Sequence, residues 1–142
     1  MHKVFGEKLN IEYFTRKGAY LIPIDGDMVA VVKTPKGYFF LGGGIEEGET
    51  DEQCIVRECR EETGCNVTVG QKICSAESFT YHKRVGYFHP VQTYYTGTVG
   101  RTTDWRIEKD HTLMWIEYAE IKGRMFSEMQ NWALDICWRN YR

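Results

Sequence analysis

The sequence predicts an α+β fold, a sandwich in which a mixed β-sheet is combined with two helices. Three observations support this prediction. Apolar and aromatic strand-like runs fill the first third of the chain and much of the stretch after residue 65. A helix is expected in the middle of the chain, from Thr50 to Thr63. A second helix is expected near the end, over Glu128–Arg139, and this order of elements favours a layered arrangement.

The first third of the chain is predicted to form short strands joined by tight turns. Met28–Val32 is continuously apolar, so we expect it to be buried on both faces. The expected elements, in order, are an irregular strand and turn over residues 4–14, a strand over Ala19–Ile24, a hairpin turn at Asp25–Asp27, a strand over Met28–Val32, a turn at Thr34–Gly37 and a strand over Tyr38–Leu41. The last of these leads directly into Gly42, Gly43 and Gly44, which we interpret as a loop where the backbone approaches a ligand closely.

The central helix has recognisable start and stop signals. Thr50 and Gln53 have the spacing of a capping box, in which each side chain satisfies a backbone N–H of the other residue. Gly64 directly follows Thr63, and glycine is the residue that most readily takes the left-handed conformation that ends helices. The helix is therefore expected to begin at Thr50 and to end at Thr63.

Three glutamates lie on one side of this helix. Glu58, Glu61 and Glu62 fall within an arc of about 140° at 3.6 residues per turn. Like charges at these spacings repel one another and destabilise an isolated helix. Their clustering indicates either a bound divalent cation with oxygen ligands or a solvated acidic surface.

The second half is expected to contain further strands and the closing helix. These elements are a strand over Asn66–Thr80 with a turn or bulge at Gly70, a strand over Val85–Val99 with Pro90 at an edge or bulge, a polar loop over Gly100–Asp110, a strand over Thr112–Ile116, and a helix over Glu128–Arg139 that begins with a second capping-box pair, Ser127 and Gln130. One stripe of the closing helix has core spacing and consists of Met129, Trp132, Ala133 and Ile136.

Length and composition narrow the class of protein. Residues 1–142 are expected to form a single domain with a substantial core. The hydrophobic content of 42% is typical of a globular chain, and the net charge of −2 argues against binding a nucleic-acid polymer by phosphate neutralisation. The chain has no apolar run long enough to cross a bilayer, and its first residues lack the apolar core of a signal peptide. We therefore expect a cytoplasmic protein without a membrane partner.

Cysteine and histidine give no sign of a metal site. The five cysteines form no CxxC pair, and buried free thiols in a reducing cytosol are expected rather than disulfides or zinc ligands. The histidines show no ligand spacing and are interpreted as surface or core residues; they are His2, His82, His89 and His111.

The spacing of the whole central run is more specific than the glutamates alone. Gly43 is followed after five residues by Glu49, and after seven more by Arg57-Glu58-Cys59, one residue, Glu61-Glu62, one residue and Gly64-Cys65. This run, Gly43 to Cys65, resembles the Nudix box in every fixed position. Cys59 and Cys65 stand where the family carries bulky aliphatic residues, and Leu41 stands where many members carry proline. The resemblance implies the α/β/α sandwich of a small bacterial-type Nudix hydrolase.

The resemblance also implies an activity. Nudix hydrolases cleave the pyrophosphate bond of a nucleoside diphosphate linked to another moiety, so the expected substrate is a nucleoside triphosphate or a nucleotide-sugar-like molecule. The expected cofactor is Mg²⁺, with Mn²⁺ able to substitute, held by Glu58, Glu61 and Glu62 and by the carbonyl of Gly42 or Gly43. Either Glu58 or Glu61 is expected to act as the base. The alternative is a non-catalytic nucleotide-binding module on the same fold, although every acid of the box is retained.

Other residues have two interpretations each. Arg57 either orients Glu49 by a bidentate contact or lies on the helix surface. Glu49 either supports the metal ligands or favours the helix start by its charge. The loop acids Glu108 and Asp110 either join the metal and substrate site or are only solvated.

Five aromatic residues are candidates for contact with a nucleobase or, as is common for aromatic residues, for packing in the core: Tyr20, Phe40, Tyr81, Phe88 and Trp132. Of these, Tyr81 and Trp132 are expected to bind substrate. The substrate is expected to be a small molecule, and formation of a homodimer is left open.

Overall fold

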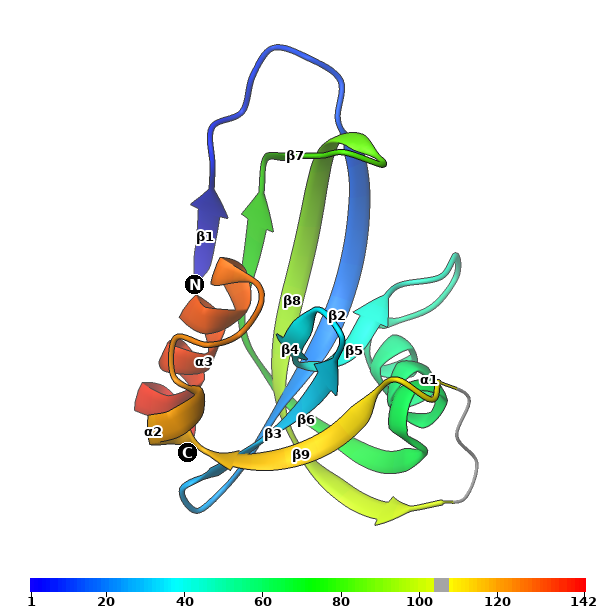
Figure 1. Ribbon diagram of the computed structural model, residues 1–142, viewed down its shortest axis with the longest axis vertical. Coiled ribbons are helices and arrows are strands. Elements are labelled where there is room, and N and C mark those ends of the chain that lie inside the picture. Colours follow the sequence, from blue (N-terminus) through cyan, green and yellow to red (C-terminus); the bar gives the residue numbers. More distant parts are fainter. Residues whose placement is uncertain (104–107) are drawn as a thin grey trace.

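The computed structural model describes residues 1–103 and 108–142, and in this part of the chain nine strands form a mixed sheet against which helices are packed (Figure 1). The elements, in order, are β1 (His2–Phe5), β2 (Phe14–Asp25), β3 (Met28–Thr34), β4 (Gly37–Phe39), β5 (Leu41–Gly44), α1 (Asp51–Thr63), β6 (Cys65–Ser78), β7 (Thr80–His82), β8 (Gly86–Thr102), β9 (Thr112–Glu117), α2 (Tyr118–Ile121) and α3 (Glu128–Asn140).

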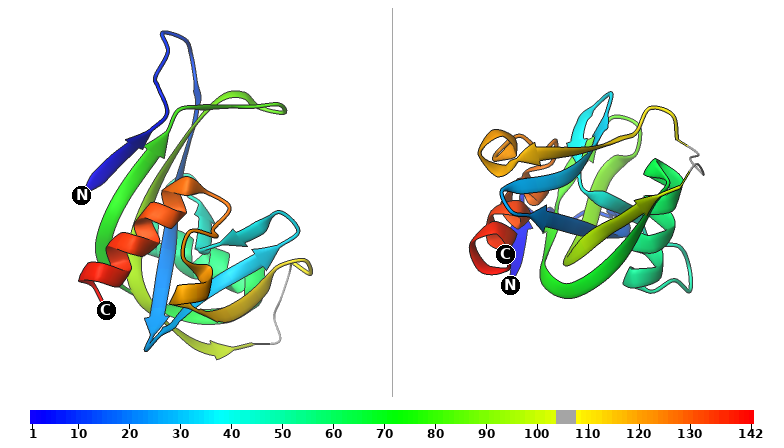
Figure 2. Two further views of the ribbon diagram at one scale, coloured as in Figure 1. Left: turned by 60° about the vertical axis from the view of Figure 1, so that its left-hand side comes forward. Right: turned by 90° about the horizontal axis from the view of Figure 1, so that it is seen from below.

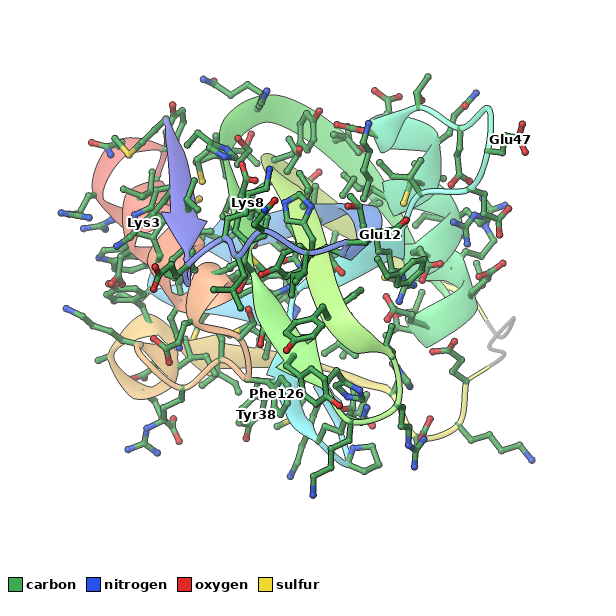
Figure 3. The ribbon with its side chains drawn as sticks, turned by 90° about the horizontal axis from the view of Figure 1, so that it is seen from above. Lys3, Lys8, Glu12, Tyr38, Glu47 and Phe126 are labelled. Atoms are coloured by element: carbon green, nitrogen blue, oxygen red, sulfur yellow. The ribbon has the colours of Figure 1, made fainter. Side chains whose placement is uncertain are left out.

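Strand β2 connects the two parts of the sheet. Over most of its length it runs parallel to β8, and its middle also pairs with β5 in antiparallel orientation. Only Ile24 and Asp25 at its end pair with β3, which in turn carries β4 and β9. An extended connection with Lys8 and Glu12 passes over one end of the molecule between β1 and β2 (Figure 3). The sheet therefore bends along β2, and the short strand β5 lies in the bend.

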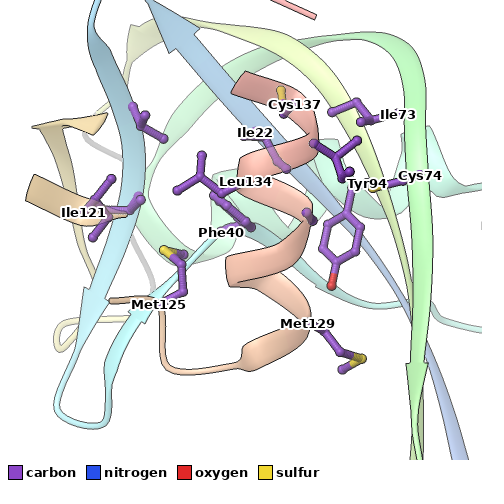
Figure 4. Close-up of a cluster of buried hydrophobic side chains, with 14 of the residues drawn as sticks. Ile22, Phe40, Ile73, Cys74, Tyr94, Ile121, Met125, Met129, Leu134 and Cys137 are labelled. Carbon is purple, nitrogen blue, oxygen red and sulfur yellow. The ribbon is translucent and has the colours of Figure 1, made fainter. Parts of the chain in front are cut away.

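Helices α1 and α3 cover opposite sides of this sheet (Figure 2), which confirms the predicted α+β sandwich with its α/β/α layers. One core cluster lies beneath α3 and includes Tyr94, Ile22 and Leu134 (Figure 4). The other lies beneath α1 and includes Leu21, Cys54 and Ile55. No helix among the described residues is long and apolar enough to cross a membrane.

Local signals in the sequence are confirmed where they depend on neighbouring residues. Thr50 and Gln53 form the predicted capping box, and Gly64 ends α1 with φ 71°. Residues 29–32 of β3 are fully buried, as the continuous apolar run predicted. The register between β6 and β8 shifts around Gly70, where a bulge was expected. All five cysteines are buried free thiols.

Three predictions about the sheet were wrong. The glycine run is a strand, β5, because its backbone pairs with β2. Gly100–Thr102 belongs to β8 rather than to a loop, whereas residues 104–107 of that predicted loop lie outside the described part. Pro90 lies in a central strand between β6 and β2, but at the level where β6 ends and β7 begins, so its missing N–H coincides with an interruption of the neighbouring strand.

The capping box predicted at Ser127 is also wrong, since the Ser127 side chain makes no cap hydrogen bond. Gln130 is 1% exposed and turns its side chain toward the sheet instead. Its Oε1 accepts from the backbone N–H of Phe40 at 2.9 Å, and its Nε2 donates to Gln92 at 3.3 Å. The buried backbone between β4 and β5 would otherwise have an unsatisfied donor, so the tertiary contact replaces the local one.

Trp132 lies on the stripe of α3 that faces the sheet, where it is half-buried. Its ring meets Phe5 of β1 edge to face, with centroids 6.3 Å apart. We expect Trp132→Ala to lower the free energy of unfolding by about 3 kcal/mol, the lower end for large aromatic residues, because part of the ring remains in water. Chemical denaturation measures this, and Trp115→Ala on the exposed face of β9 is the matched control. An unchanged free energy of unfolding in Trp132→Ala, together with a raised KM for nucleotides, would instead place Trp132 in the substrate site.

Candidate functional site

The guanidinium of Arg57, in the middle of α1, uses all five of its N–H donors. Nε and Nη2 bind the two carboxylate oxygens of Glu49 at 2.6 and 2.9 Å. Nη1 donates to Glu58 at 2.6 Å and to Glu61 at 3.1 Å. The remaining donor on Nη2 reaches the carbonyl oxygen of Gly44 at 3.0 Å. The predicted bidentate contact with Glu49 is therefore present, and Arg57 also ties the helix to β5.

Glu49 is held in its charged form by these contacts. The hydrogen bonds from Arg57 lower its pKa to about 2, and the backbone N–H of Glu46 contributes a further hydrogen bond at 3.0 Å. Glu49 thus closes the loop between β5 and α1. Figure 3 shows neighbouring Glu47 at the outer end of this loop, pointing away from the body of the protein.

The glycines of β5 leave room for different neighbours. Gly42 has φ 138°, and a Cβ there would collide with the carbonyl oxygen of Ala19. A Cβ on Gly43 would lie 2.5 Å from Oε2 of Glu58. The carboxylate of Glu58 therefore rests directly on the backbone of β5.

Glu58 and Glu62 lie in surroundings that disfavour their charged forms. Burial raises the pKa of Glu58, although Arg57 opposes the shift. Burial and the nearby charge of Glu58 raise the pKa of Glu62 to about 9. The only hydrogen bond that the described part shows for the Glu62 carboxylate comes from the N–H of Gly42, at 3.3 Å. These two carboxylates therefore form an acidic centre that the protein neutralises only in part.

The segment before β9 brings further ligand-type groups to this centre. The backbone N–H of Glu108 donates to the carbonyl oxygen of Glu61 at 3.2 Å. Nε2 of His111 lies 3.1 Å from Glu108 and 3.8 Å from Glu62, and its Nδ1 lies 2.9 Å from Asp110. One ligand atom each from Glu62, Glu108 and His111 lies within 4.8 Å of the other two. Two carboxylates and an imidazole at this spacing are able to hold a divalent ion.

These groups border a cavity of about 440 Å³. Its acidic side includes Glu58 and Glu62 with the backbone of Gly42 and Gly43, together with Glu108, Asp110 and His111. The rest of the lining consists of the turn at Thr34 and Pro35 and of cationic and aromatic residues. These cationic and aromatic residues are Arg16, Lys36, Tyr20, Phe39 and Phe40. The cavity thus combines oxygen ligands for a cation with positive charge and apolar rings, a combination that suits a nucleotide.

The structure places the remaining predicted residues outside this cavity. Glu61 shares Nη1 of Arg57 with Glu58 and so lies beside it, but it borders the outer face of α1. Trp132 packs against Phe5, as described above. Tyr81 is 61% exposed on β7, where its ring meets Tyr87.

The sequence did not identify several residues of the cavity, among them His111 and Arg16. His111 was interpreted as a surface or core residue, although its position three residues after Glu108 was an available signal. Arg16 lies far in sequence from the glutamates, so no local pattern links it to them.

This chain is similar to one known protein family and to several solved structures. The NUDIX domain matches residues 15–136. Similar solved structures include a NUDIX hydrolase from Nitrosomonas europaea, 16% identical with a TM-score of 0.75, covering 91% of this chain and 92% of that one. A MutT NUDIX hydrolase from Burkholderia pseudomallei is 18% identical with a TM-score of 0.71, covering 86% and 97%. An ADP-ribose pyrophosphatase from Streptococcus suis is 12% identical with a TM-score of 0.65, covering 89% and 92%. No curated protein gives a match.

The pair formed by Arg57 and Glu49 predicts a loss of stability in acid. The folded-state pKa of Glu49 is about 2, below the ordinary value of 4.5, so its contribution is complete above about pH 4.5 and is lost as the pH falls toward 2. We expect the free energy of unfolding to fall more steeply between pH 5 and pH 2 in the wild type than in Glu49→Gln. Urea denaturation at several pH values measures both slopes. Parallel curves for the two proteins would show that this pair does not contribute to acid sensitivity.

Proposed function

Because the chain belongs to the Nudix family, we infer that it is a pyrophosphohydrolase, and we propose that it cleaves the pyrophosphate bond of a nucleoside diphosphate linked to another moiety. A nucleoside triphosphate and a nucleotide-sugar-like molecule both fit this description, and the MutT and ADP-ribose pyrophosphatase neighbours support this substrate class. The observation that carries the proposal is the convergence of Glu58 and Glu62 on the glycine backbone of β5, at a cavity that also offers cations and aromatic rings.

The donor set fits a hard divalent cation. Burial raises the pKa of both Glu58 and Glu62, so a cation would stabilise the charged forms that the protein alone disfavours. We propose that these residues hold Mg²⁺ together with Glu61 beside them and Glu108 from the segment before β9. The imidazole of His111 in the same cluster makes Mn²⁺ a suitable substitute. The carbonyl oxygen of Gly43 already accepts a hydrogen bond from the Cys54 thiol at 3.3 Å. We therefore propose the carbonyl oxygen of Gly42 as the backbone ligand of the metal ion.

The proposed chemistry divides into neutralisation and proton transfer. When bound, Mg²⁺ supplies the positive charge that allows a water molecule to attack an anionic diphosphate. Glu58 is the proposed general base, because its carboxylate lies over the Gly43 backbone at the cavity. Arg57 binds one oxygen of Glu58 and leaves the other over Gly43, which fixes the direction in which the carboxylate points. Arg57 and Glu49 thus act by positioning, and Asp110 borders the substrate cavity.

The cysteines indicate the compartment in which the protein acts. Five buried free thiols fit a reducing compartment, so we propose a cytoplasmic protein that acts on small molecules. We also propose that the chain functions as one domain, since the family match extends over residues 15–136.

The first test of the proposal is dependence on a divalent ion. We expect negligible hydrolysis of nucleoside diphosphate derivatives in excess chelator, and recovery of turnover on addition of Mg²⁺ or Mn²⁺, because the carboxylates cannot approach an anionic substrate without a cation. A panel of ATP, ADP-ribose and a nucleotide sugar, with identification of the products, measures this. Full turnover in chelator would refute the metal role, and binding without turnover would favour the non-catalytic module.

The second test removes single charges from the acidic centre. Glu62→Gln and Glu61→Gln are each expected to reduce kcat at least about a hundredfold. Because the folded-state pKa of Glu62 is raised from 4.5 to about 9, its stabilising effect is complete below pH 4.5 and is lost as the pH rises to 9. Metal-free Glu62→Gln should therefore be more stable than wild type at pH 8 but not at pH 4, as thermal melts will show. Normal turnover in both variants would mean that the box is vestigial.

A further inference from the structure

Arg16 lies on β2 beside the glycine strand β5, and its guanidinium rests on the backbone of Gly44. A Cβ on Gly44 would lie 2.6 Å from Nη2 of Arg16, 2.7 Å from Nε and 3.0 Å from Cζ. Gly44 has no unusual positive φ, so the backbone itself does not require glycine at this position. The space that Gly44 leaves open is therefore space for the Arg16 guanidinium.

Arg16 forms no ion pair with a carboxylate among the described residues, in contrast to Arg57, which pairs with four. Yet Arg16 borders the same cavity as Glu58 and Glu62. An exposed arginine that borders a cavity, with no carboxylate partner among the described residues, is suited to bind anionic oxygens.

Arg16 and Glu58 reach the cavity from opposite faces of β5. Glu58 lies over Gly43 and Arg16 lies over Gly44, and successive residues of a strand point to opposite faces. Both side chains border the same cavity of about 440 Å³, so a cation held by Glu58 and the guanidinium of Arg16 face one ligand from two sides, which suits two linked phosphate groups.

We propose that Arg16 binds the phosphate group of the substrate that the metal ligands do not hold, and that Gly44 is glycine in order to admit its guanidinium. This inference rests on the proposed function and deepens it, because it assigns a phosphate-binding residue outside the central motif. Arg16 is a specificity residue for linked phosphates, and it takes no part in proton transfer.

The test measures binding of inorganic pyrophosphate by isothermal titration calorimetry in the presence of Mg²⁺. Arg16→Gln removes the charge, and Gly44→Ala keeps the charge but displaces the guanidinium. Lys17→Gln is the matched control, because it removes one exposed cation from the same strand at a position that points to the opposite face. Thermal melts and Mg²⁺ titrations without pyrophosphate establish that the fold and the metal site are retained.

We expect Arg16→Gln to weaken pyrophosphate binding roughly ten- to a hundredfold, the effect of losing charge-assisted hydrogen bonds, and Lys17→Gln to leave it unchanged. Gly44→Ala should reproduce most of this loss, and the double variant should bind no more weakly than Arg16→Gln, because both changes remove one interaction. Three outcomes would overturn the proposal. They are wild-type affinity for pyrophosphate in Arg16→Gln, losses of affinity that multiply in the double variant, and no binding of pyrophosphate by the wild-type protein.

Hydrolysis assays on the same variants separate this inference from the proposed function. Nucleotide turnover that is unaffected in KM and kcat by Arg16→Gln would refute the phosphate role while the hydrolase assignment stands. Arg16-dependent pyrophosphate binding in a protein that hydrolyses no nucleotide would refute the hydrolase assignment while the phosphate site stands.

Discussion

The guanidinium of Arg57 is the interaction on which the site depends. It connects three carboxylates of the loop and helix α1 to the Gly44 carbonyl of β5, and thereby fixes the helix against the strand. A lysine could not replace it, because an ammonium group lacks the planar fork that binds Glu49 through two nitrogens. With all its donors occupied, Arg57 has no capacity left for a ligand, so the role that we propose for it is to fix the direction of Glu58.

Helix α1 and the loop before it hold carboxylates in two opposite electrostatic conditions. Glu49 is fully satisfied by Arg57, which lowers its pKa to about 2, whereas burial raises the pKa of Glu62 to about 9. Arg57 neutralises Glu49, but no cationic side chain in the described part of the chain compensates the charge of Glu62 to the same extent. The buried charge of Glu62 therefore lowers the stability of the metal-free protein. Such an arrangement is understandable if a cation supplies the missing charge, and Glu108 and His111 lie where they would assist it.

The strand β5 shows how absent side chains build a site. Gly42 is needed for its backbone conformation, whereas Gly43 leaves room for the Glu58 carboxylate and Gly44 leaves room for the Arg16 guanidinium. A strand so short, placed in the bend of the sheet, brings an acidic group and a basic group to neighbouring residues. The cavity of about 440 Å³ is lined by residues of β2, β5, α1 and the segment before β9.

The sequence by itself determined α1, its caps at Thr50 and Gly64, and the common face of its glutamates, because helix ends and helix periodicity depend on residues only a few positions apart. It also indicated the sandwich, through the order of its apolar runs. Only the tertiary structure decided that the glycine run is a strand, that Gln130 bonds Phe40 instead of capping α3, and that Arg16 and His111 border the cavity. These contacts join residues that are distant in the chain, and they are fixed by the register of β2 with β5 and of β3 with β9, which no local pattern specifies.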